Sequence, residues 1–311
     1  MGSSCYKLLF CYKCYRLGGN LAVISREEIK NWIEVVSEGE FHYKDIMGLR
    51  TVMTPELDTN LRKVMHDFCH QVSPICESMG RGYYRWIDAL PEPENWQDTD
   101  PTKDFPVVLP FDLRKYVWID PETHINVAGS KDSGKTGFLM RTVAMNMNLV
   151  NTVFLCNMEG GRNQLRRRFD AMDIDIPNPP PFKTWIRTEN FHDYMKEPDT
   201  LYVIDYIDVP ESGEFFMIAP AIAKIQKKLQ ELKNCVAVIG LQKKFSSDTA
   251  YGGEQTMKKA SLYIAMNPGK LKIISAKIHT DPRVDPKNMQ FTFEYSEEGT
   301  AFRNIQPYYG D

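Results

Sequence analysis

The chain lacks a strong excess of charge, a long apolar run and a regular arrangement of cysteines. Its 311 residues carry a formal net charge of -3, so overall charge does not indicate a nucleic-acid partner, and only a local basic surface could do so. No stretch approaches the roughly 20 apolar residues of a membrane span, so we expect no membrane partner. Hydrophobic content of 42% and charged content of 25% are ordinary for a globular protein with a sizeable core.

The seven cysteines do not suggest a disulfide framework. Their number is odd, and Cys156 and Cys235 lie within apolar runs, where a buried free thiol is the simplest interpretation. The pair Cys11-x-x-Cys14 has no second close pair, which disfavours a zinc knuckle near Cys5. We therefore infer a reducing compartment and predict a cytoplasmic protein, in the host cytoplasm if it is viral.

Composition and the position of a Pro-rich stretch divide the chain into four parts. The first segment does not fit a signal peptide, because Lys7 and Lys13 interrupt its apolar run. It is either a disordered leader or the result of a start codon upstream of the domain. A Pro-rich acidic stretch separates two periodic regions and is typical of a linker. The predicted parts are a leader over residues 1–22, a small domain over 23–90, the linker over 91–106 and a large domain over 107–311.

The small domain is predicted to contain three helices followed by a hairpin. Ser25 and Glu28 form a capping box before an amphipathic helix, and Thr54 with Pro55 starts another. Residues 41–47 fit a short helix between them. The turn Gly80-Arg81-Gly82 joins two short strands. This order is similar to that of a winged helix-turn-helix domain.

Two interpretations of the small domain stay open. Winged helices bind duplex DNA through the third helix and the hairpin, but many bind only protein. The predicted exposed face carries basic side chains that favour the first interpretation. The candidate DNA-contacting residues are Arg62, Lys63, Arg81 and Arg85.

The large domain alternates strands with helices, which predicts an α/β fold with a mostly parallel sheet and strands added at its C-terminal end. The predicted strands cover residues 124–129, 152–158, 201–207, 235–241, 261–266, 270–278, 290–296 and 301–307, and the helices cover 136–148, 161–172 and 218–232.

Between the first strand and helix stands a G-x4-G-K-[ST] motif. Its glycines let the loop wrap so that backbone N–H groups face phosphate oxygens, with Lys135 at the β- and γ-phosphates and Thr136 on Mg²⁺. The motif therefore predicts ATP and Mg²⁺ as cofactors. Its residues are Gly129, Ser130, Lys131, Asp132, Ser133, Gly134, Lys135 and Thr136.

Two carboxylates complete the predicted site. Asp205 follows a buried apolar run and is the candidate second ligand for Mg²⁺, with Asp208 a weaker one. Glu159 follows another strand and is either the base that orients water or a helix-capping residue. The arginines after Glu159 either contact nucleotide, DNA or a neighbouring subunit, or form a solvated face; they are Arg162, Arg166, Arg167 and Arg168.

The order of these motifs resembles the RecA-like ATPases, most closely the core of DnaB-type replicative helicases. The resemblance covers roughly residues 105–307 and places Glu159 as the catalytic glutamate and Gln242 as the γ-phosphate sensor. It makes the following loop DNA-facing and implies single-stranded DNA as a partner and a hexamer or filament as the assembly. The lysines expected to make that loop basic are Lys243, Lys244, Lys258 and Lys259.

The chain departs from the helicase pattern at two places. The family carries a Lys-x-Arg pair that reaches the neighbouring subunit's nucleotide; Lys277 matches the lysine, but His279 stands at the arginine. Either Arg283 or Lys277 serves in its place, or hydrolysis between subunits is weak. The helical primase-interaction domain is also replaced by the winged-helix-like segment. Such winged-helix-plus-ATPase arrangements resemble proteins predicted in bacteriophage genomes.

The leading hypothesis is an ATP-hydrolysing DNA-handling protein, a phage-type replication or recombination ATPase with DnaB-like helicase organisation and a replication protein as a further partner. The alternative is an ATP-dependent switch, such as a helicase loader or DNA-bound regulator, that unwinds nothing. A DNA-binding adaptor with a relic ATP site is disfavoured, because Lys135, Thr136, Asp205 and Glu159 are all retained.

Overall fold

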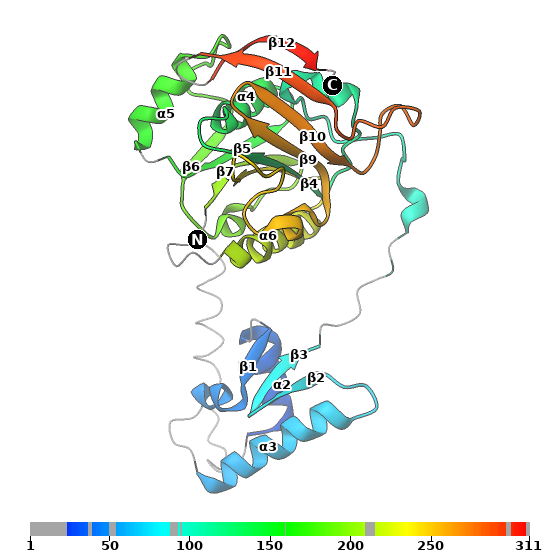
Figure 1. Ribbon diagram of the computed structural model, residues 1–311. Coiled ribbons are helices and arrows are strands. Elements are labelled where there is room, and N and C mark those ends of the chain that lie inside the picture. The colour runs from blue at the N-terminus through cyan, green and yellow to red at the C-terminus, as the bar shows by residue number, and fades with distance from the viewer. Residues whose placement is uncertain are drawn as a thin grey trace. The chain divides into compact units, whose positions relative to one another are not determined.

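The protein comprises two units, Met1–Trp96 and Gln97–Asp311, which we describe separately (Figure 1). The computed structural model describes residues 24–36, 39–49, 54–87, 93, 95–158, 160–208, 215–296 and 300–308. The predicted leader lies outside these residues, and so does part of the predicted linker.

The N-terminal unit is a small α+β structure with a three-stranded antiparallel sheet in the order β1-β3-β2. The predicted caps are confirmed: the Glu28 backbone N–H donates to the Ser25 hydroxyl, the Ser25 N–H donates to the Glu28 carboxylate, and the Leu57 N–H donates to the Thr54 hydroxyl. Its elements are α2 (Arg26–Val36), β1 (Glu40–His42), the 3₁₀ helix η1 (Tyr43–Leu49), α3 (Pro55–His70), β2 (Cys76–Gly80) and β3 (Tyr83–Trp86).

The predicted helix over residues 41–47 is wrong at its start, where the chain forms β1 before it enters η1. Phe41 pairs with Tyr84 of β3 and packs against Trp32 and Tyr84. A cross-strand partner thus outweighs a weak local helical preference. The winged-helix interpretation of the unit stays a prediction.

The C-terminal unit is built on one nine-stranded sheet (Figure 1). Its strands are β4 (Thr123–Gly129), β5 (Asn151–Cys156), β6 (Lys183–Ile186), β7 (Thr200–Ile207), β8 (Val236–Gln242), β9 (Ala260–Asn267), β10 (Lys270–Ala276), β11 (Gln290–Tyr295) and β12 (Phe302–Tyr308). Its helices are α4 (Lys135–Asn146), α5 (Gly161–Asp170) and α6 (Ile218–Leu232), with 3₁₀ helices η3 (Pro110–Lys115), η4 (Phe191–Tyr194), η5 (Phe215–Met217) and η6 (Gly253–Met257).

The strand order is β12-β11-β10-β9-β4-β8-β7-β5-β6. The six strands from β9 to β6 are parallel, whereas β10, β11 and β12 are antiparallel additions. The predicted fold class is therefore confirmed as an α/β fold with a mostly parallel sheet and strands added at its C-terminal end. Sequence reasoning missed β6, a four-residue edge strand whose side chains are mostly exposed.

The two faces of the sheet are covered by different helices. Val203 and Val238 belong to the core on the α4 side with Phe138, whereas Ile204 and Ile239 belong to the core on the α6 side. Alternate residues of each parallel strand thus enter opposite cores, which explains their near-continuous apolar runs. This double cover fixes the strand ends, where the P-loop lies.

A buried histidine at the start of β4 makes stability depend on pH. His124 Nδ1 lies 2.6 Å from the Oε1 of Gln226 and donates to it, because an amide oxygen only accepts. Burial lowers the His124 pKa from 6.5 to about 4. The unfolded chain therefore binds this proton more tightly than the folded chain, so stability is full above pH 6.5 and is lost as the pH falls toward 4.

We expect the free energy of unfolding to fall by about 2 kcal/mol from pH 7.5 to pH 5 through His124 alone. Urea denaturation followed by circular dichroism at both pH values measures this loss. The matched His124→Gln variant should lose correspondingly less between the same two values. Equal losses in the two proteins would show that His124 is not the responsible group.

Candidate functional site

The P-loop joins the end of β4 to the start of α4, and its two glycines are sterically required. A Cβ on Gly129 would lie 2.6 Å from the Ser133 hydroxyl and 2.8 Å from the Lys135 Cβ. Gly134 has a φ of 82°, in the left-handed region that favours glycine. Because the first N–H groups of a helix have no acceptor within it, α4 directs free donors at the loop, as anion binding requires.

Two hydroxyls of the P-loop are buried without a hydrogen-bond partner among the described residues, namely those of Ser130 and Ser133. A buried polar atom without a partner costs free energy, so such atoms indicate a ligand or water. The loop therefore fits a polar, anionic group on both steric and hydrogen-bonding grounds.

Lys135 is buried in this loop rather than extended into solvent. Its side chain retains 8% exposure, and its Nζ lies 3.7 Å from the centre of the Tyr206 ring. Burial lowers the Lys135 pKa to about 8, against the opposing effect of Asp205 and Asp208. Sequence reasoning missed Tyr206, although its place directly after Asp205 on β7 was a usable signal.

Asp205 lies beside the helix start, as the sequence predicts for a metal-holding carboxylate. The Thr136 hydroxyl donates to its Oδ1 at 3.3 Å. Burial raises the Asp205 pKa, while Lys135, Thr136 and Arg168 oppose that rise. A hydroxyl and a carboxylate oxygen side by side fit Mg²⁺, which prefers oxygen ligands.

Gln242 ends the strand next to β4 and lies level with the P-loop. It pairs with Gly129 in the β4–β8 register, and the following N–H, of Lys243, donates to the Gly129 carbonyl at 3.0 Å. The sheet thus brings the predicted sensor to the first glycine of the motif.

Glu159, the predicted catalytic base, lies outside the described residues, and its role stays a prediction. Its neighbourhood is defined nevertheless. The Asn157 N–H donates to the Asp205 carbonyl at 2.6 Å, so the chain leaves β5 beside the predicted metal ligand. Arg168 of α5 also lies near enough to lower the pKa of Asp205, which ties the arginine-rich helix to this side of the site.

The two trans-acting candidates lie at the opposite edge of the sheet from the P-loop. Because β10 runs antiparallel to β9, its end at Ala276 pairs with Leu262 near the start of β9. Lys277 follows directly and is exposed, and Arg283 is exposed and paired with Asp281 at 2.9 Å. Lys277 thus lies about a strand length from its own P-loop, so its predicted role at a nucleotide requires another copy.

The lysines predicted to form one basic loop separate into three environments. Lys243 is buried, with 2% exposure, and its ammonium is bound by oxygens of its own chain, so the prediction that it contributes to a DNA-facing surface is wrong. Lys244 is exposed at the P-loop edge. Lys258 and Lys259 are exposed at the start of β9, roughly 25 Å away along the strand direction.

Exposed aromatic side chains near Lys244 were missed by sequence reasoning. Phe245 and Phe216 are 70% and 68% exposed. Phe215 stacks on Tyr251 at 4.7 Å between ring centres, and the Tyr251 N–H donates to the Gln242 carbonyl. Large exposed aromatics connected to the predicted sensor indicate a binding surface rather than core packing. We call Lys244, Phe245, Phe215 and Phe216 the aromatic edge.

The N-terminal unit presents less free positive charge than the sequence predicts. Arg62 pairs with Asp58 at 2.7 Å, and Arg85 pairs with Glu77 at 2.6 Å. Lys63 is exposed without an ion pair to any described residue, and the same is true of Arg81 at the hairpin turn. Duplex binding by this unit stays a prediction.

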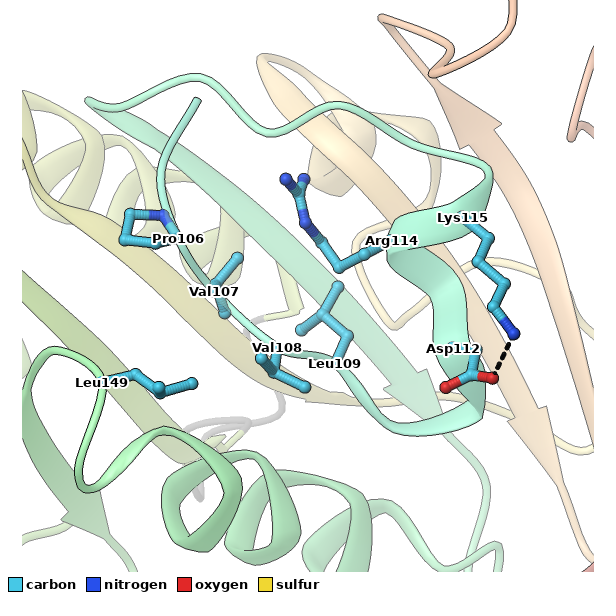
Figure 2. A pocket seen from close by; sticks show the side chains of 8 residues that line it. All are labelled: Pro106, Val107, Val108, Leu109, Asp112, Arg114, Lys115 and Leu149. Atoms are coloured by element: carbon cyan, nitrogen blue, oxygen red, sulfur yellow. Dashed lines mark hydrogen bonds and ion pairs between the residues drawn. The ribbon is translucent and has the colours of Figure 1, made fainter. Parts of the chain in front are cut away.

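A separate pocket, away from the predicted site residues, is mostly apolar (Figure 2). Lys115 and Asp112 pair across its rim at 2.6 Å. Its lining residues are Pro106, Val107, Val108, Leu109, Asp112, Arg114, Lys115 and Leu149. Because none of them belongs to the P-loop or its neighbours, this pocket is not the phosphate site.

Comparisons with known proteins find similarity among solved structures. No protein-family model and no curated protein matches the sequence. Among solved structures, the RadB recombinase is similar at 11% sequence identity and a TM-score of 0.44, over 60% of this chain and 92% of that chain. No helix in the described part of the chain is long and apolar enough to cross a membrane. We therefore base the functional assignment on the geometry of the site.

The buried lysine predicts a pH dependence of nucleotide affinity. Phosphate binding requires the Lys135 ammonium, whose pKa in the free site is about 8. Affinity should therefore be full below pH 8 and fall roughly tenfold by pH 9, as the ammonium loses its proton. Titration with a fluorescent ATP analogue at pH 7.5 and pH 9 measures the change.

The control for this experiment is Lys135→Arg, because a guanidinium keeps its charge at both pH values. The variant is expected to bind more weakly but with little pH dependence. A wild-type affinity that stays constant up to pH 9 would contradict the assigned role of the ammonium.

Proposed function

We propose that the chain binds and hydrolyses ATP with Mg²⁺ and couples this to the handling of DNA. The observation that carries the proposal is the convergence of Lys135, Thr136, Asp205 and Gln242 at one end of the sheet. Asp205 and Gln242 lie far from the P-loop in the sequence, so a chance match to the motif would not bring them beside it.

Each residue has a role that follows from its chemistry. The Lys135 ammonium would neutralise the β- and γ-phosphates, and Thr136 with Asp205 would hold the metal. Bound Mg²⁺ would supply charge neutralisation on the transferred phosphoryl group. Glu159 would orient the attacking water, and Gln242 would sense the γ-phosphate.

The aromatic edge supports single-stranded DNA as the polymer. Bases of any sequence stack on exposed aromatic rings, and a neighbouring lysine attracts the phosphate backbone. Phe245 and Phe215 supply rings and Lys244 the charge, and Phe215 is connected to Gln242 through Tyr251. Lys258 and Lys259 lie too far along the strand direction to join this contact.

The finer hypothesis is a phage-type replication or recombination ATPase with DnaB-like organisation, working as a hexamer or filament. Lys277 supports an assembly, because its predicted role at a nucleotide requires another copy. An arginine in trans contributes roughly 10³–10⁵ to the rate, and His279 stands at the expected arginine. This departure favours the alternative, an ATP-dependent switch such as a helicase loader.

The proposal is tested by ATP hydrolysis with and without single-stranded DNA. Glu159→Gln should lower the hydrolysis rate by roughly 10²–10⁴-fold while nucleotide binding persists, because only the water-orienting carboxylate is lost. The matched control is Glu231→Gln, an exposed glutamate of α6. Normal hydrolysis by Glu159→Gln would remove the catalytic assignment.

The mass of the protein in solution with ATP separates the two hypotheses. DNA-stimulated hydrolysis by a hexamer-sized or filamentous species supports a motor. Tight ATP binding with little turnover, no effect of DNA and a monomer or dimer supports the switch.

The aromatic edge makes a prediction about affinity. Phe245→Ala should weaken binding of a single-stranded oligonucleotide about tenfold, because one base–aromatic stacking contact contributes roughly 1–3 kcal/mol. Fluorescence anisotropy of a labelled oligothymidine measures it. Tyr308→Ala, which removes an exposed aromatic of the edge strand β12, is the control. Equal affinities for the wild type and Phe245→Ala would exclude this surface.

A further inference from the structure

The buried ammonium of Lys243 holds three separate oxygens. Lysine has three N–H donors, and they reach the carbonyls of Lys244 and Ser247 at 3.2 and 2.8 Å and the Asn267 Oδ1 at 2.6 Å. The residue is 2% exposed, so these bonds replace hydration completely. A lysine in this state stabilises local structure much as a bound cation would.

The position of these bonds relative to the P-loop strand is significant. Lys243 follows β8 and Asn267 ends β9, and these two strands flank β4 on either side. Neighbouring strands lie about 4.8 Å apart, so the backbones of β8 and β9 are separated by roughly 10 Å. The side chains of Lys243 and Asn267 together bridge this distance across the end of β4. It therefore crosses the sheet where the P-loop begins.

Backbone bonds attach the same residues to the P-loop. The Lys243 N–H donates to the Gly129 carbonyl at 3.0 Å, and the Ser130 N–H donates to the Met266 carbonyl at 3.1 Å. The P-loop is thus hydrogen-bonded to Lys243 itself and to Met266, the residue before Asn267. We call Lys243 and Asn267 the clamp.

On its outer side the clamp holds the aromatic edge. The Lys243 ammonium binds the carbonyls of Lys244 and Ser247, and the Asn267 Nδ2 donates to the Phe245 carbonyl at 3.3 Å. The backbone of Lys244 and Phe245 is thereby fixed to the strands on both sides of the P-loop.

We propose that Lys243 is a positioning residue that couples occupancy of the P-loop to the conformation of the aromatic edge. This inference rests on the proposed nucleotide binding and adds a physical connection to it. Coupling between two sites is reciprocal, so DNA bound at the aromatic edge should change nucleotide affinity through the same clamp.

The test is cleavage after Phe245 by chymotrypsin, with and without a non-hydrolysable ATP analogue and Mg²⁺. In the full-length wild type the analogue should change the cleavage rate about fivefold or more, the lower range of a coupled pair. Lys243→Met keeps the length of the side chain but removes the ammonium, and the ratio should fall to about one while the analogue still binds. Lys227→Met removes a charge from an exposed lysine of α6, outside the site and the aromatic edge, and should keep the wild-type ratio.

The ratio distinguishes coupling from stability. A residue with a structural role alone would raise cleavage equally with and without the analogue, and would leave the ratio unchanged. Asn267→Ala removes the bond to the Lys243 ammonium from the β9 side. If Lys243→Met fails to fold, the cleavage ratio of Asn267→Ala tests the coupling instead.

Two results overturn the proposal in different ways. The coupling role is wrong if the wild type binds the analogue but its cleavage rate does not change. It is also wrong if a clamp variant binds the analogue and keeps the wild-type ratio. If the wild type fails to bind the analogue, the proposed nucleotide function itself is wrong.

Discussion

The site depends on a buried cation and a buried carboxylate held beneath the P-loop. Burial lowers the pKa of Lys135 and raises that of Asp205, because it destabilises the charged form of each group. The opposite charge of the other group partly offsets this destabilisation. Phosphate oxygens and a divalent cation are the groups that would satisfy both. The Tyr206 ring beside the ammonium and the two buried serine hydroxyls fit the same interpretation, because they prepare a polar site closed to bulk water.

This arrangement follows from where the strands end. Lys135 and Asp205 are brought together because β4 and β7 are parallel and separated by β8 alone, so their carboxyl ends meet at one edge. The same order places Gln242 opposite Gly129. Helices α4 and α6 on opposite faces supply the burial that fixes these ends. Chemistry at the edge therefore depends on apolar packing well below it.

Sequence reasoning identified the features that local signals carry. The P-loop, the caps at Ser25 and Thr54, and Asp205 at the end of an apolar run all depend on neighbours within a few residues. Lys243 was misassigned because one of the oxygens that hold its buried ammonium belongs to Asn267, 24 residues away and two strands across. The strand at Phe41 was missed for the same reason, since its partner Tyr84 lies far along the chain. Long-range pairing leaves no local pattern in a single sequence.

The lysines that the sequence assigns to the loop after β8 lie at different ends of the sheet. Lys244 lies at the P-loop edge, but Lys259 and Lys277 both lie close enough to His124, at the start of β4, to lower its pKa. These two therefore belong to one surface at the opposite edge, although the sequence assigned one to DNA and the other to a neighbouring subunit. A single copy cannot bring that surface to its own P-loop. If the chain assembles with the P-loop edge of one copy against the opposite edge of the next, Lys259 joins Lys277 as a candidate contact between copies, which leaves the aromatic edge as the proposed DNA contact.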